Sequence, residues 1–466
     1  MFTLSPHTLI RPEPDGALLF QQETAETALL NLQGLDVLVG FVKGALRDHP
    51  IFFVQYLREK RFVVPGRPDG AVKTLERVRD LAPSTTAPPR SLAAPETIHF
   101  SVTGRCDLAC TGCFYSVRPG SQVTPDDAPF QLFDKVVREA ERAGVFQIAL
   151  GGGEPLLHPH IVDMVRLARQ HQLVPNLTTN GNRLTLDVAL ALKEAGLGQV
   201  QISLNGATEE TNATTRPNFA GAMAAIHACQ QAGLRFGINF LITRSGVAEL
   251  EEVVHLGRRL GAATVNLLRP KPPTTDGDWL QQESLDAEGY RTVKKVLRKL
   301  QSEARGRIKT SEVSTAPPSG STVASDNAPG LARYREDLRG LPVDCKTTLD
   351  ASLTFLLTDR PPERLYAAGV WGCCAARKFV TVLQDGVVLP CSHVRWSDVG
   401  QGDFMRAWQD SEVFNRFRRL EEKMQGPCRS CTYLDLCKGC PAVVMAFGGD
   451  FANSDPHCPR HVKHET

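Results

Sequence analysis

The sequence predicts an α/β protein built around a partial (β/α)6 barrel of the TIM type. Residues 96–305 alternate short β-type runs with longer helical ones, an order typical of a parallel sheet with crossover helices. The polar motifs of this region follow the strands, at the end where a β/α barrel builds its active site. A small α+β block at 1–80 precedes the barrel, and a Cys-rich domain at 341–466 follows it.

Six strands and the helices between them make up the predicted barrel. The strands are expected at Thr97–Val102, Gln147–Leu150, Leu173–Leu177, Gln199–Leu204, Phe236–Ile242 and Thr264–Leu268. The helices are expected at 126–143, 159–171, 185–195, 219–232 and 247–260. The motifs just beyond the first four strands are a cysteine group, Gly151–Pro155, Thr178–Gly181 and Asn205–Gly206.

The first 80 residues predict a separate, winged-helix-like unit. The run LIRPEPDGALLFQ is typical of two strands joined by a turn at Glu13–Gly16, with a third strand at Thr27–Asn31. Helices are expected near 35–47 and 50–61. Two stretches rich in Pro, Ser, Thr and Ala predict a flexible linker at 81–95 and a second linker or mobile insertion at 306–340.

Composition excludes several classes of function. The chain has 466 residues and a net charge of +2, with mixed acids and bases, so we expect neither nucleic-acid nor membrane binding. Met1–Pro12 has no secretion signal, and no apolar run is long enough to span a membrane. A cytoplasmic protein is expected. In that compartment thirteen cysteines indicate metal ligands rather than disulfides.

The first cysteine group carries the chemistry. Cys106, Cys110 and Cys113 have the spacing C-x3-C-x2-C directly after the first strand. Three thiolates can hold three irons of a 4Fe–4S cube and leave the fourth iron open to a reactant. From spacing alone, a zinc site without its fourth ligand is the alternative.

This motif, with Phe114 after its third cysteine and GGGEP downstream, resembles the radical S-adenosylmethionine (SAM) superfamily. The resemblance implies SAM bound at the open iron and its reductive cleavage to a 5′-deoxyadenosyl radical that abstracts a substrate hydrogen. It also implies SAM contacts from Gly151, Gly152, Gly153, Glu154, Pro155, Ser203 and Arg216. For Ser203 and Arg216 the alternatives are a polar residue at a strand end and a surface ion pair. No catalytic acid or base is assigned.

The C-terminal cysteines are similar to the SPASM extension of radical SAM enzymes. Their order is C-x12-G-x4-C, then C-x2-C-x5-C-x2-C, then a last cysteine. The resemblance implies two auxiliary 4Fe–4S clusters, hence three in all. The implied ligands are Cys373, Cys391 and Cys440 for the first auxiliary cluster, and Cys428, Cys431, Cys437 and Cys458 for the second. The eighth ligand is Cys374, Cys345 or none, and a zinc ribbon over 428–440 is the alternative.

The N-terminal block resembles the PqqD-like leader-recognition elements of peptide-modifying radical SAM enzymes. This rests on three strands followed by helices and on the motif DG-x-LLF, and a generic winged-helix or dimerisation module is the alternative. The implied function is radical modification of a ribosomally made precursor peptide, giving a thioether, a carbon–carbon crosslink or an epimerised residue. A flavodoxin or ferredoxin-type protein would supply electrons. The alternatives are a maturase of a folded protein (anaerobic sulfatase maturase-like), a cofactor-pathway enzyme, and a non-catalytic iron–sulfur or zinc-stabilised binding protein.

Overall fold

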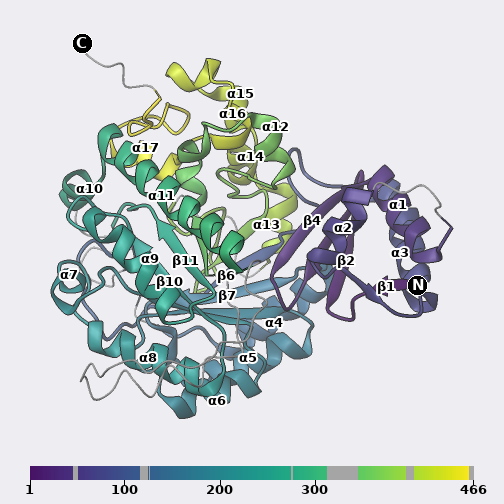
Figure 1. The fold of residues 1–466 in the computed structure, drawn as a ribbon, viewed down its shortest axis with the longest axis horizontal. Coiled ribbons are helices and arrows are strands. Elements are labelled where there is room, and N and C mark those ends of the chain that lie inside the picture. The colour runs from purple at the N-terminus through teal and green to yellow at the C-terminus, as the bar shows by residue number, and fades with distance from the viewer. Residues whose placement is uncertain are drawn as a thin grey trace.

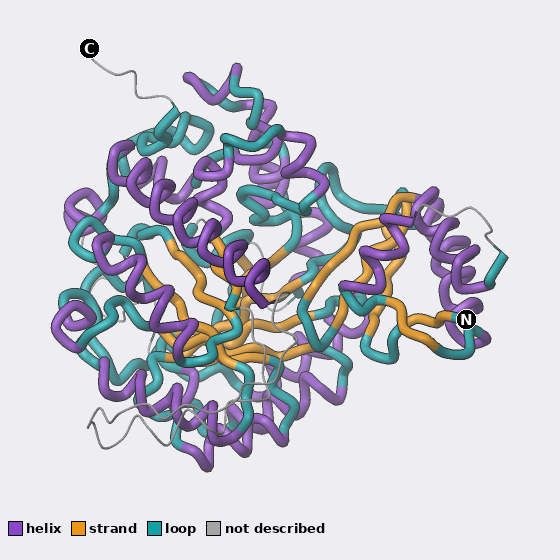
Figure 2. The backbone as a smooth tube through the Cα atoms, in the orientation of Figure 1, coloured by secondary structure: helices purple, strands orange, loops and turns teal. Residues whose placement is uncertain are grey.

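The computed structural model describes residues 1–45, 51–115, 124, 126–273, 277–311, 345–394 and 403–460. Most of the molecule is a strand-lined barrel with helices outside it, and the N-terminal unit lies at one side (Figure 1). Figure 2 shows the same division, with strands at the centre of the larger part. The predicted α/β class with a central parallel sheet is confirmed.

One nine-stranded sheet forms the barrel wall, in the order β12-β11-β10-β9-β8-β7-β6-β13-β14. Neighbouring strands from β12 to β13 pair in parallel, and β14 pairs antiparallel to β13. The strands are β6 (Thr97–Thr103), β7 (Gln147–Gly152), β8 (Val174–Thr179), β9 (Gln199–Ser203), β10 (Phe236–Leu241), β11 (Thr264–Leu268), β12 (Lys346–Leu349), β13 (Phe379–Val382) and β14 (Val388–Leu389). All six predicted strands are present. Because β12 and β14 are the two ends of this order, the barrel is open, as a partial barrel requires.

The two faces of the barrel wall differ in chemistry. One face buries apolar side chains such as Phe100 and Ile148 against the surrounding helices. Side chains on the opposite face include amides that bind one another. The Nδ2 atom of Asn266 donates to Gln201 Oε1 at 2.9 Å and to Asn239 Oδ1 at 2.8 Å. Beside β9, β10 and β11 the barrel interior is therefore lined by neutral polar side chains that bind one another by hydrogen bonds.

The barrel helices bury one stripe each, as their sequence period predicts. In α4 the buried residues Phe133, Val136, Val137 and Ala140 recur at three- and four-residue spacing. The helices are α4 (Phe130–Ala143), α5 (Ile161–Gln170), α6 (Leu186–Glu194), α7 (Glu209–Ala213), α8 (Phe219–Ala232), α9 (Leu250–Arg259), α10 (Gly277–Glu283) and α11 (Ala287–Ser311). All five predicted barrel helices are present, with ends shifted by a few residues.

The N-terminal unit has a three-stranded antiparallel sheet in the order β2-β3-β4. Its strands and helices are β1 (Phe2–Leu4), β2 (Thr8–Glu13), β3 (Gly16–Gln21), β4 (Glu26–Asn31), α1 (Leu32–Lys43), α2 (Ile51–Glu59), β5 (Val63–Pro65) and α3 (Asp69–Leu81). The three predicted strands and two predicted helices are present. The pair β1–β5 and the helix α3 were not predicted. Two three-residue strands give weak periodic signals, whereas in α3 the core residues Ala71, Val72, Leu75 and Val78 recur at three- and four-residue spacing and could have indicated the helix.

The expected flexible linker at 81–95 is instead a packed segment. Leu92 is buried, its N–H donates to Arg377 O at 3.1 Å, and its carbonyl accepts from Trp408 Nε1 at 3.1 Å. Arg11 of β2 donates to the carbonyl of Ala94 at 2.8 Å. The N-terminal unit is therefore fixed against the barrel, because buried contacts outweigh the flexibility that Pro, Ser and Thr favour.

The C-terminal region lies beside the barrel (Figure 1). Its helices are α12 (Pro362–Ala367), α13 (Phe404–Asp410), α14 (Glu412–Arg418), α15 (Leu420–Lys423), α16 (Leu434–Cys437) and α17 (Pro441–Ala446). The predicted insertion at 306–340 lies outside the described residues beyond Ser311. Within the described ranges, no helix is both long enough and apolar enough to cross a membrane.

Candidate functional site

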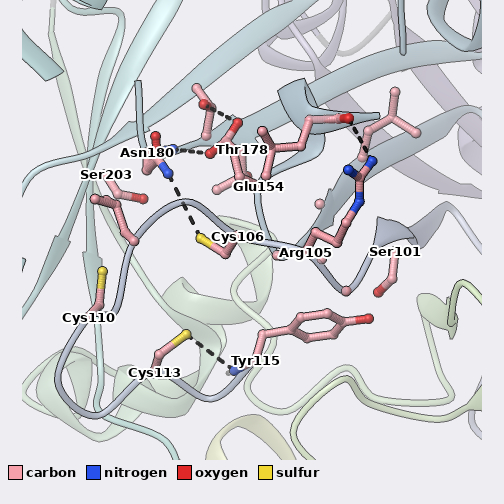
Figure 3. A pocket seen from close by; sticks show the side chains of 18 of the residues that line it. Ser101, Arg105, Cys106, Cys110, Cys113, Tyr115, Glu154, Thr178, Asn180 and Ser203 are labelled. Carbon is pink, nitrogen blue, oxygen red and sulfur yellow. Dashed lines mark hydrogen bonds between the residues drawn. The ribbon is translucent and has the colours of Figure 1, made fainter. Parts of the chain in front are cut away.

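A cavity of about 960 Å³ opens at the C-terminal ends of β6 to β9 (Figure 3). It brings together most of the residues that the sequence singled out: Cys106, Cys110, Cys113, Gly151, Gly152, Gly153, Glu154, Ser203 and Arg216. Pro155 does not line it but is buried at the start of the short turn behind Glu154. The motifs that follow these strands therefore gather at one edge of the sheet, as expected for parallel strands.

The cysteine loop is held by polar contacts on both sides. Asn180 Nδ2 lies 3.9 Å from Cys106 Sγ and donates to Asp107 Oδ1 at 2.7 Å. The backbone N–H of Tyr115 donates to Cys113 Sγ at 3.4 Å. These contacts hold Cys106 and Cys113, and all three cysteines lie on one short loop, as Figure 3 shows.

The GGGEP motif braces that loop through its backbone. Gly153 N–H donates to Thr103 O at 2.8 Å, and Glu154 N–H donates to Arg105 O at 2.7 Å. A Cβ at Gly153 would lie 2.0 Å from Arg105 O, and one at Gly152 would lie 2.4 Å from Thr103 O. Glycine is therefore required at both positions by close backbone approach, and at Gly152 also by a φ of 116°.

The carboxylate of Glu154 ties the motif to the next strand. It accepts from Thr179 Oγ1 and Asn180 N, each at 2.7 Å, and from Leu156 N at 3.1 Å. Burial raises the pKa of Glu154, and these donors oppose the rise because they favour the ionised form. The sequence singled out Glu154 but could not show that three donors within the chain already occupy its carboxylate.

Ser203 and Arg216 reach the cavity from β9 and from the segment after α7. Arg216 is half-buried, and its Nε, buried within the wall, has no hydrogen-bond acceptor among the described residues. Asn205 does not line the cavity: its Nδ2 donates to Thr215 Oγ1 at 2.9 Å and its Oδ1 accepts from Leu241 N at 3.2 Å. A structural role accounts for Asn205, whereas Arg216 presents an unsatisfied donor to the cavity wall.

Four C-terminal cysteines surround a second, much smaller cavity. Its lining includes the four predicted ligands of the second auxiliary cluster, Cys428, Cys431, Cys437 and Cys458. Burial raises the pKa of Cys437 and of Cys458 to about 12. Without a metal these thiols are neutral near pH 7, so a metal that binds here must displace their protons.

Cys373, Cys391 and Cys440 form a separate group. Burial, the larger cause, raises the pKa of Cys373 and of Cys391, and Cys440 raises both further. Cys374 also raises the pKa of Cys373, and its own Sγ donates to Gly372 O at 3.1 Å. Cys345 precedes the N-terminal end of β12, where the charge that acts on it is Arg258 of α9. The structure thus places Cys345 at the opposite end of the barrel wall from the strand ends that form the site.

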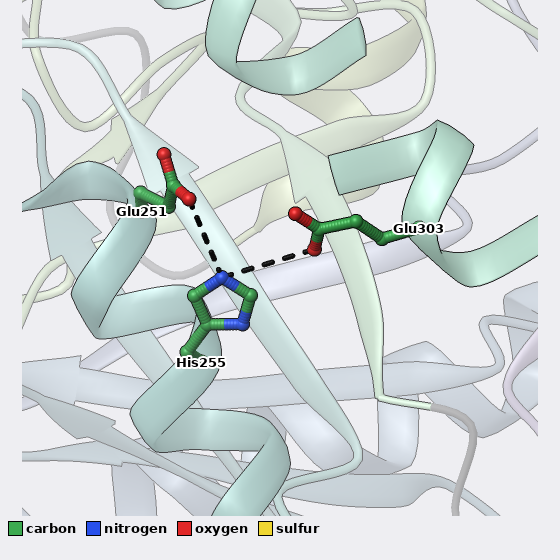
Figure 4. A group of neighbouring side chains, drawn as sticks. All are labelled: Glu251, His255 and Glu303. Carbon is green, nitrogen blue, oxygen red and sulfur yellow. Dashed lines mark ion pairs between the residues drawn. The ribbon is translucent and has the colours of Figure 1, made fainter. Parts of the chain in front are cut away.

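A further cluster, Glu251, His255 and Glu303, has carboxylate and imidazole atoms within 4.8 Å of one another (Figure 4). Lys299 Nζ already contacts Glu251 at 2.5 Å, and Arg258 contacts Glu303 at 3.4 Å. These cations balance the carboxylates, so we interpret the cluster as ion pairs that join α9 to α11.

Comparisons with known proteins identify two domains. Residues 100–257 match the radical SAM superfamily, and residues 373–432 match an iron–sulfur cluster-binding domain, SPASM. The chain contains a radical SAM domain and a SPASM domain. These two domains indicate 4Fe–4S clusters and SAM as cofactors.

Similar proteins include an AdoMet-dependent heme synthase of Methanosarcina barkeri, 26% identical over 78% of this chain and 96% of that protein. A PqqA peptide cyclase of Gluconobacter oxydans is 29% identical over 81% of this chain and 93% of its own length. Among solved structures, Streptococcus suis SuiB bound to S-adenosylmethionine superposes with a TM-score of 0.67 at 15% identity, covering 98% of this chain and 99% of SuiB. The last comparison shows a shared fold that includes the N-terminal unit.

The residues of the large cavity fit a SAM-binding cluster. Cys106, Cys110 and Cys113 are the only cysteines among the described residues that line it, so a cube held there keeps one iron open. Arg216 also lines the cavity, and its guanidinium is a suitable partner for a carboxylate such as that of methionine. The donor set and the cradle therefore agree with the cofactors that the two domains indicate.

Proposed function

We propose that this protein is a radical SAM enzyme that modifies a ribosomally made precursor peptide. The product is a thioether, a carbon–carbon crosslink or an epimerised residue. The single observation that carries the proposal is the large cavity, which extends from Cys106 to Thr381 and Ser392 of the SPASM region. Its volume of about 960 Å³ lies at the upper end of the usual range for one ligand, which leaves room for a substrate segment beside SAM.

Each element of the cavity then has a role. Cys106, Cys110 and Cys113 hold the catalytic cluster, and the backbone of Gly151–Pro155 fixes their loop through Thr103 and Arg105. Arg216 holds the SAM carboxylate by charge and hydrogen bonding, and Ser203 borders the same region. When bound, the cluster and SAM supply a 5′-deoxyadenosyl radical. Glu154 is a positioning residue that joins the cysteine loop to β8.

The SPASM cysteines hold two auxiliary clusters in this proposal. The second cluster uses four thiols around the small cavity: Cys428, Cys431, Cys437 and Cys458. The first uses Cys373, Cys391 and Cys440. Its fourth iron is open or is bound by Cys374, because Cys345 lies at the far end of the barrel wall.

The N-terminal unit is proposed to bind the leader of the precursor. A groove of about 660 Å³ lies beside the end of β4, lined by Leu29 and Leu30, by Val37 of α1, by Phe53 of α2 and by the Glu13–Gly16 turn. Strand β4 is at the edge of its sheet, and an extended peptide can add to such an edge through backbone hydrogen bonds. Leu29 is 52% exposed and offers an apolar contact beside that edge.

The fixed position of this unit changes how recognition would work. Phe20 of β3 stacks on Phe146 with ring centroids 5.3 Å apart, and Arg169 of α5 donates to Gln22 at 3.0 Å. A leader bound at β4 would be held at a constant position relative to the barrel rather than on a flexible tether. The length of peptide between leader and modified residue would then decide which residue reaches the cavity.

Two relatives support the peptide substrate and one supports an alternative. The PqqA peptide cyclase and SuiB, solved bound to precursor peptide SuiA with a TM-score of 0.66, are peptide enzymes by name. The heme synthase supports a cofactor-pathway enzyme as the second candidate, since its match covers 78% of this chain. A maturase of a folded protein is a further candidate on the same cavity.

Two further proposals concern the electron donor and the cellular location of the protein. Reductive cleavage of SAM requires an electron from outside the chain, and we propose a flavodoxin or ferredoxin-type protein as its source. Thiolate-bound clusters persist in reducing compartments, so we propose a cytoplasmic location. Replacement of dithionite by each candidate donor in the cleavage assay tests the first proposal.

The peptide proposal is tested with the anaerobically reconstituted enzyme and the short peptides encoded beside its gene. We expect mass spectrometry to show a loss of two hydrogens, or deuterium incorporation at an epimerised centre in D2O. The variant Leu29→Asp should weaken peptide binding in a fluorescence anisotropy titration by about tenfold, since one apolar contact is worth about 1.4 kcal/mol. Leu190→Asp is the matched control, since Leu190 on α6 is also exposed, at 46%. Turnover of a small cofactor precursor with no peptide product would favour the second candidate.

A further inference from the structure

His99 lies at the floor of the large cavity. It is the third residue of β6, and its neighbours Ile98 and Phe100 are buried against the helices. Because side chains alternate along a strand, His99 faces the barrel interior. Parallel pairing aligns His99 with Thr381 of β13 and with Ala149 of β7. All three residues line the cavity, and we call this row the cavity floor.

The cavity floor lies well below the cysteine loop. Strand β6 ends at Thr103, and the loop that carries Cys106 follows that end. A strand rises about 3.3 Å per residue, so the four steps from His99 to Thr103 correspond to about 13 Å along the strand. The mechanism proposed above uses groups near the cysteine loop and gives His99 no role.

An aromatic contact holds the imidazole ring in place. The rings of His99 and Phe379 are stacked, with centroids 4.6 Å apart and planes at 16°. Ala149, the neighbour on the other strand, contributes only a methyl group to the cavity floor. The hydroxyl of Thr381 is buried in the wall and forms no hydrogen bond with the described residues. The ring of His99 is therefore fixed by stacking, and its neighbours in the floor leave both ring nitrogens free.

The imidazole of His99 is neutral near pH 7. Burial lowers its pKa to about 4, and no charge or hydrogen bond from the described residues acts on it. A neutral imidazole has one N–H donor and one acceptor nitrogen. Since nearly all buried polar groups in proteins are hydrogen-bonded, a free donor and a free acceptor at the floor of a cavity indicate a ligand.

The acidic and phenolic side chains that line the same cavity are already bound within the chain. Glu154 accepts three hydrogen bonds, as described above, and Asp107 accepts one of 2.7 Å from Asn180. The hydroxyl of Tyr115 donates at 2.6 Å to a glutamine of the SPASM region. These groups fix the cavity wall, whereas His99 keeps its hydrogen-bonding capacity for a molecule inside the cavity.

We propose that His99 binds the segment of the precursor peptide that enters the cavity, through a hydrogen bond to an uncharged group of that segment. The inference rests on the proposed function. Every residue of a peptide other than proline supplies a backbone donor and a backbone acceptor, so a peptide can satisfy either ring nitrogen. A carboxylate or an ammonium group fits less well, because it would be buried beside a side chain that carries no balancing charge. In this proposal His99 holds the substrate and transfers neither a proton nor an electron.

The test uses the reconstituted full-length enzyme and a precursor peptide that the unaltered enzyme modifies. His99→Phe keeps a ring that can stack on Phe379 but removes both nitrogens. We expect it to weaken peptide binding by about five- to tenfold, as the loss of one hydrogen bond does, and to raise KM by a similar factor. The yield of modified peptide per 5′-deoxyadenosine should also fall. Iron content and 5′-deoxyadenosine formation without peptide should not change. His99→Gln keeps a donor and an acceptor and should bind the peptide within about twofold of the unaltered enzyme.

His171→Phe is the matched control, because it removes an imidazole that binds Glu141 at 2.7 Å outside the cavity. It should leave peptide affinity and product yield unchanged. If His99→Phe loads less iron, His99→Met replaces it, since methionine is close in size to glutamine and forms no comparable hydrogen bond.

Three results would overturn the inference. The first is unchanged affinity and yield in His99→Phe, and the second is an equal loss in His99→Gln and His99→Phe. The third is loss of 5′-deoxyadenosine formation without peptide in His99→Phe at full iron content, which would mean that His99 acts on SAM. Absence of any modified peptide with the unaltered enzyme would instead overturn the proposed function on which the inference rests.

Discussion

Replacement of Gly153 by alanine tests the bracing of the cysteine loop. The new Cβ would lie 2.0 Å from Arg105 O and 2.6 Å from Arg105 C, so the backbone one residue before Cys106 must move. Overpacking of this kind typically costs about 1–3 kcal/mol. For a domain of this size, that corresponds to a fall in Tm of roughly 2–12 °C. The loop shift should also separate the three thiols and reduce iron at the catalytic site.

Gly151→Ala is the control within the same motif. A Cβ at Gly151 would meet no protein atom within 4 Å, so the Tm of the cluster-free protein should not change. The assay is thermal unfolding of the cluster-free variants, followed by iron analysis after anaerobic reconstitution. Gly153→Ala should lose about four irons, since one cube carries four, while the auxiliary clusters remain. An unchanged Tm together with full iron loading in Gly153→Ala would refute the bracing argument.

Three other predictions concern separate parts of the molecule. Burial raises the pKa of Glu139 to about 7. The contribution of Glu139 to stability is therefore present below the pKa of the unfolded chain, near 4.5, and is lost as pH rises through 7. Between pH 5 and pH 8 the Tm of Glu139→Gln should rise relative to that of the unaltered protein, and a Tm difference that stays constant with pH would contradict this. Cys428→Ala with Cys431→Ala should remove one auxiliary cluster and stop product formation while some SAM cleavage continues; an active variant that contains zinc would favour a zinc ribbon. A chain that begins at Ala94 should have a lower Tm than the full chain, because it exposes Phe146, which is 3% exposed in the structure; an equal Tm would mean that the N-terminal unit is not packed as described.

The six strands and the motifs at their ends were predictable because hydrophobic period and motif position repeat along the barrel. The hairpin of β13 and β14 was not predicted, although FVTVLQDGVVL carries a strand pattern with an Asp–Gly turn. Its position depends on pairing of Phe379 with Thr97, far earlier in the chain, which no local pattern encodes.

In the candidate site, too, features that depend on local sequence were predictable and features that depend on contacts between distant segments were not. Which cysteines and glycines gather followed from the rule for strand ends, because each motif follows its own strand. The partners of Glu154 and the packing of Leu92 did not, since both depend on contacts between distant segments. Composition alone predicted flexibility for 81–95, where buried contacts with Arg11 and Trp408 determine the structure instead.

The central claim is that Cys106, Cys110 and Cys113 hold the cluster that cleaves SAM. The most direct measurement compares 5′-deoxyadenosine formation by the reconstituted protein with that of a variant in which all three are alanine, with SAM and dithionite under anaerobic conditions. We expect the unaltered protein to form 5′-deoxyadenosine and the variant to form none, with about four irons fewer, one cube's worth. Formation of 5′-deoxyadenosine by the triple variant would contradict the account.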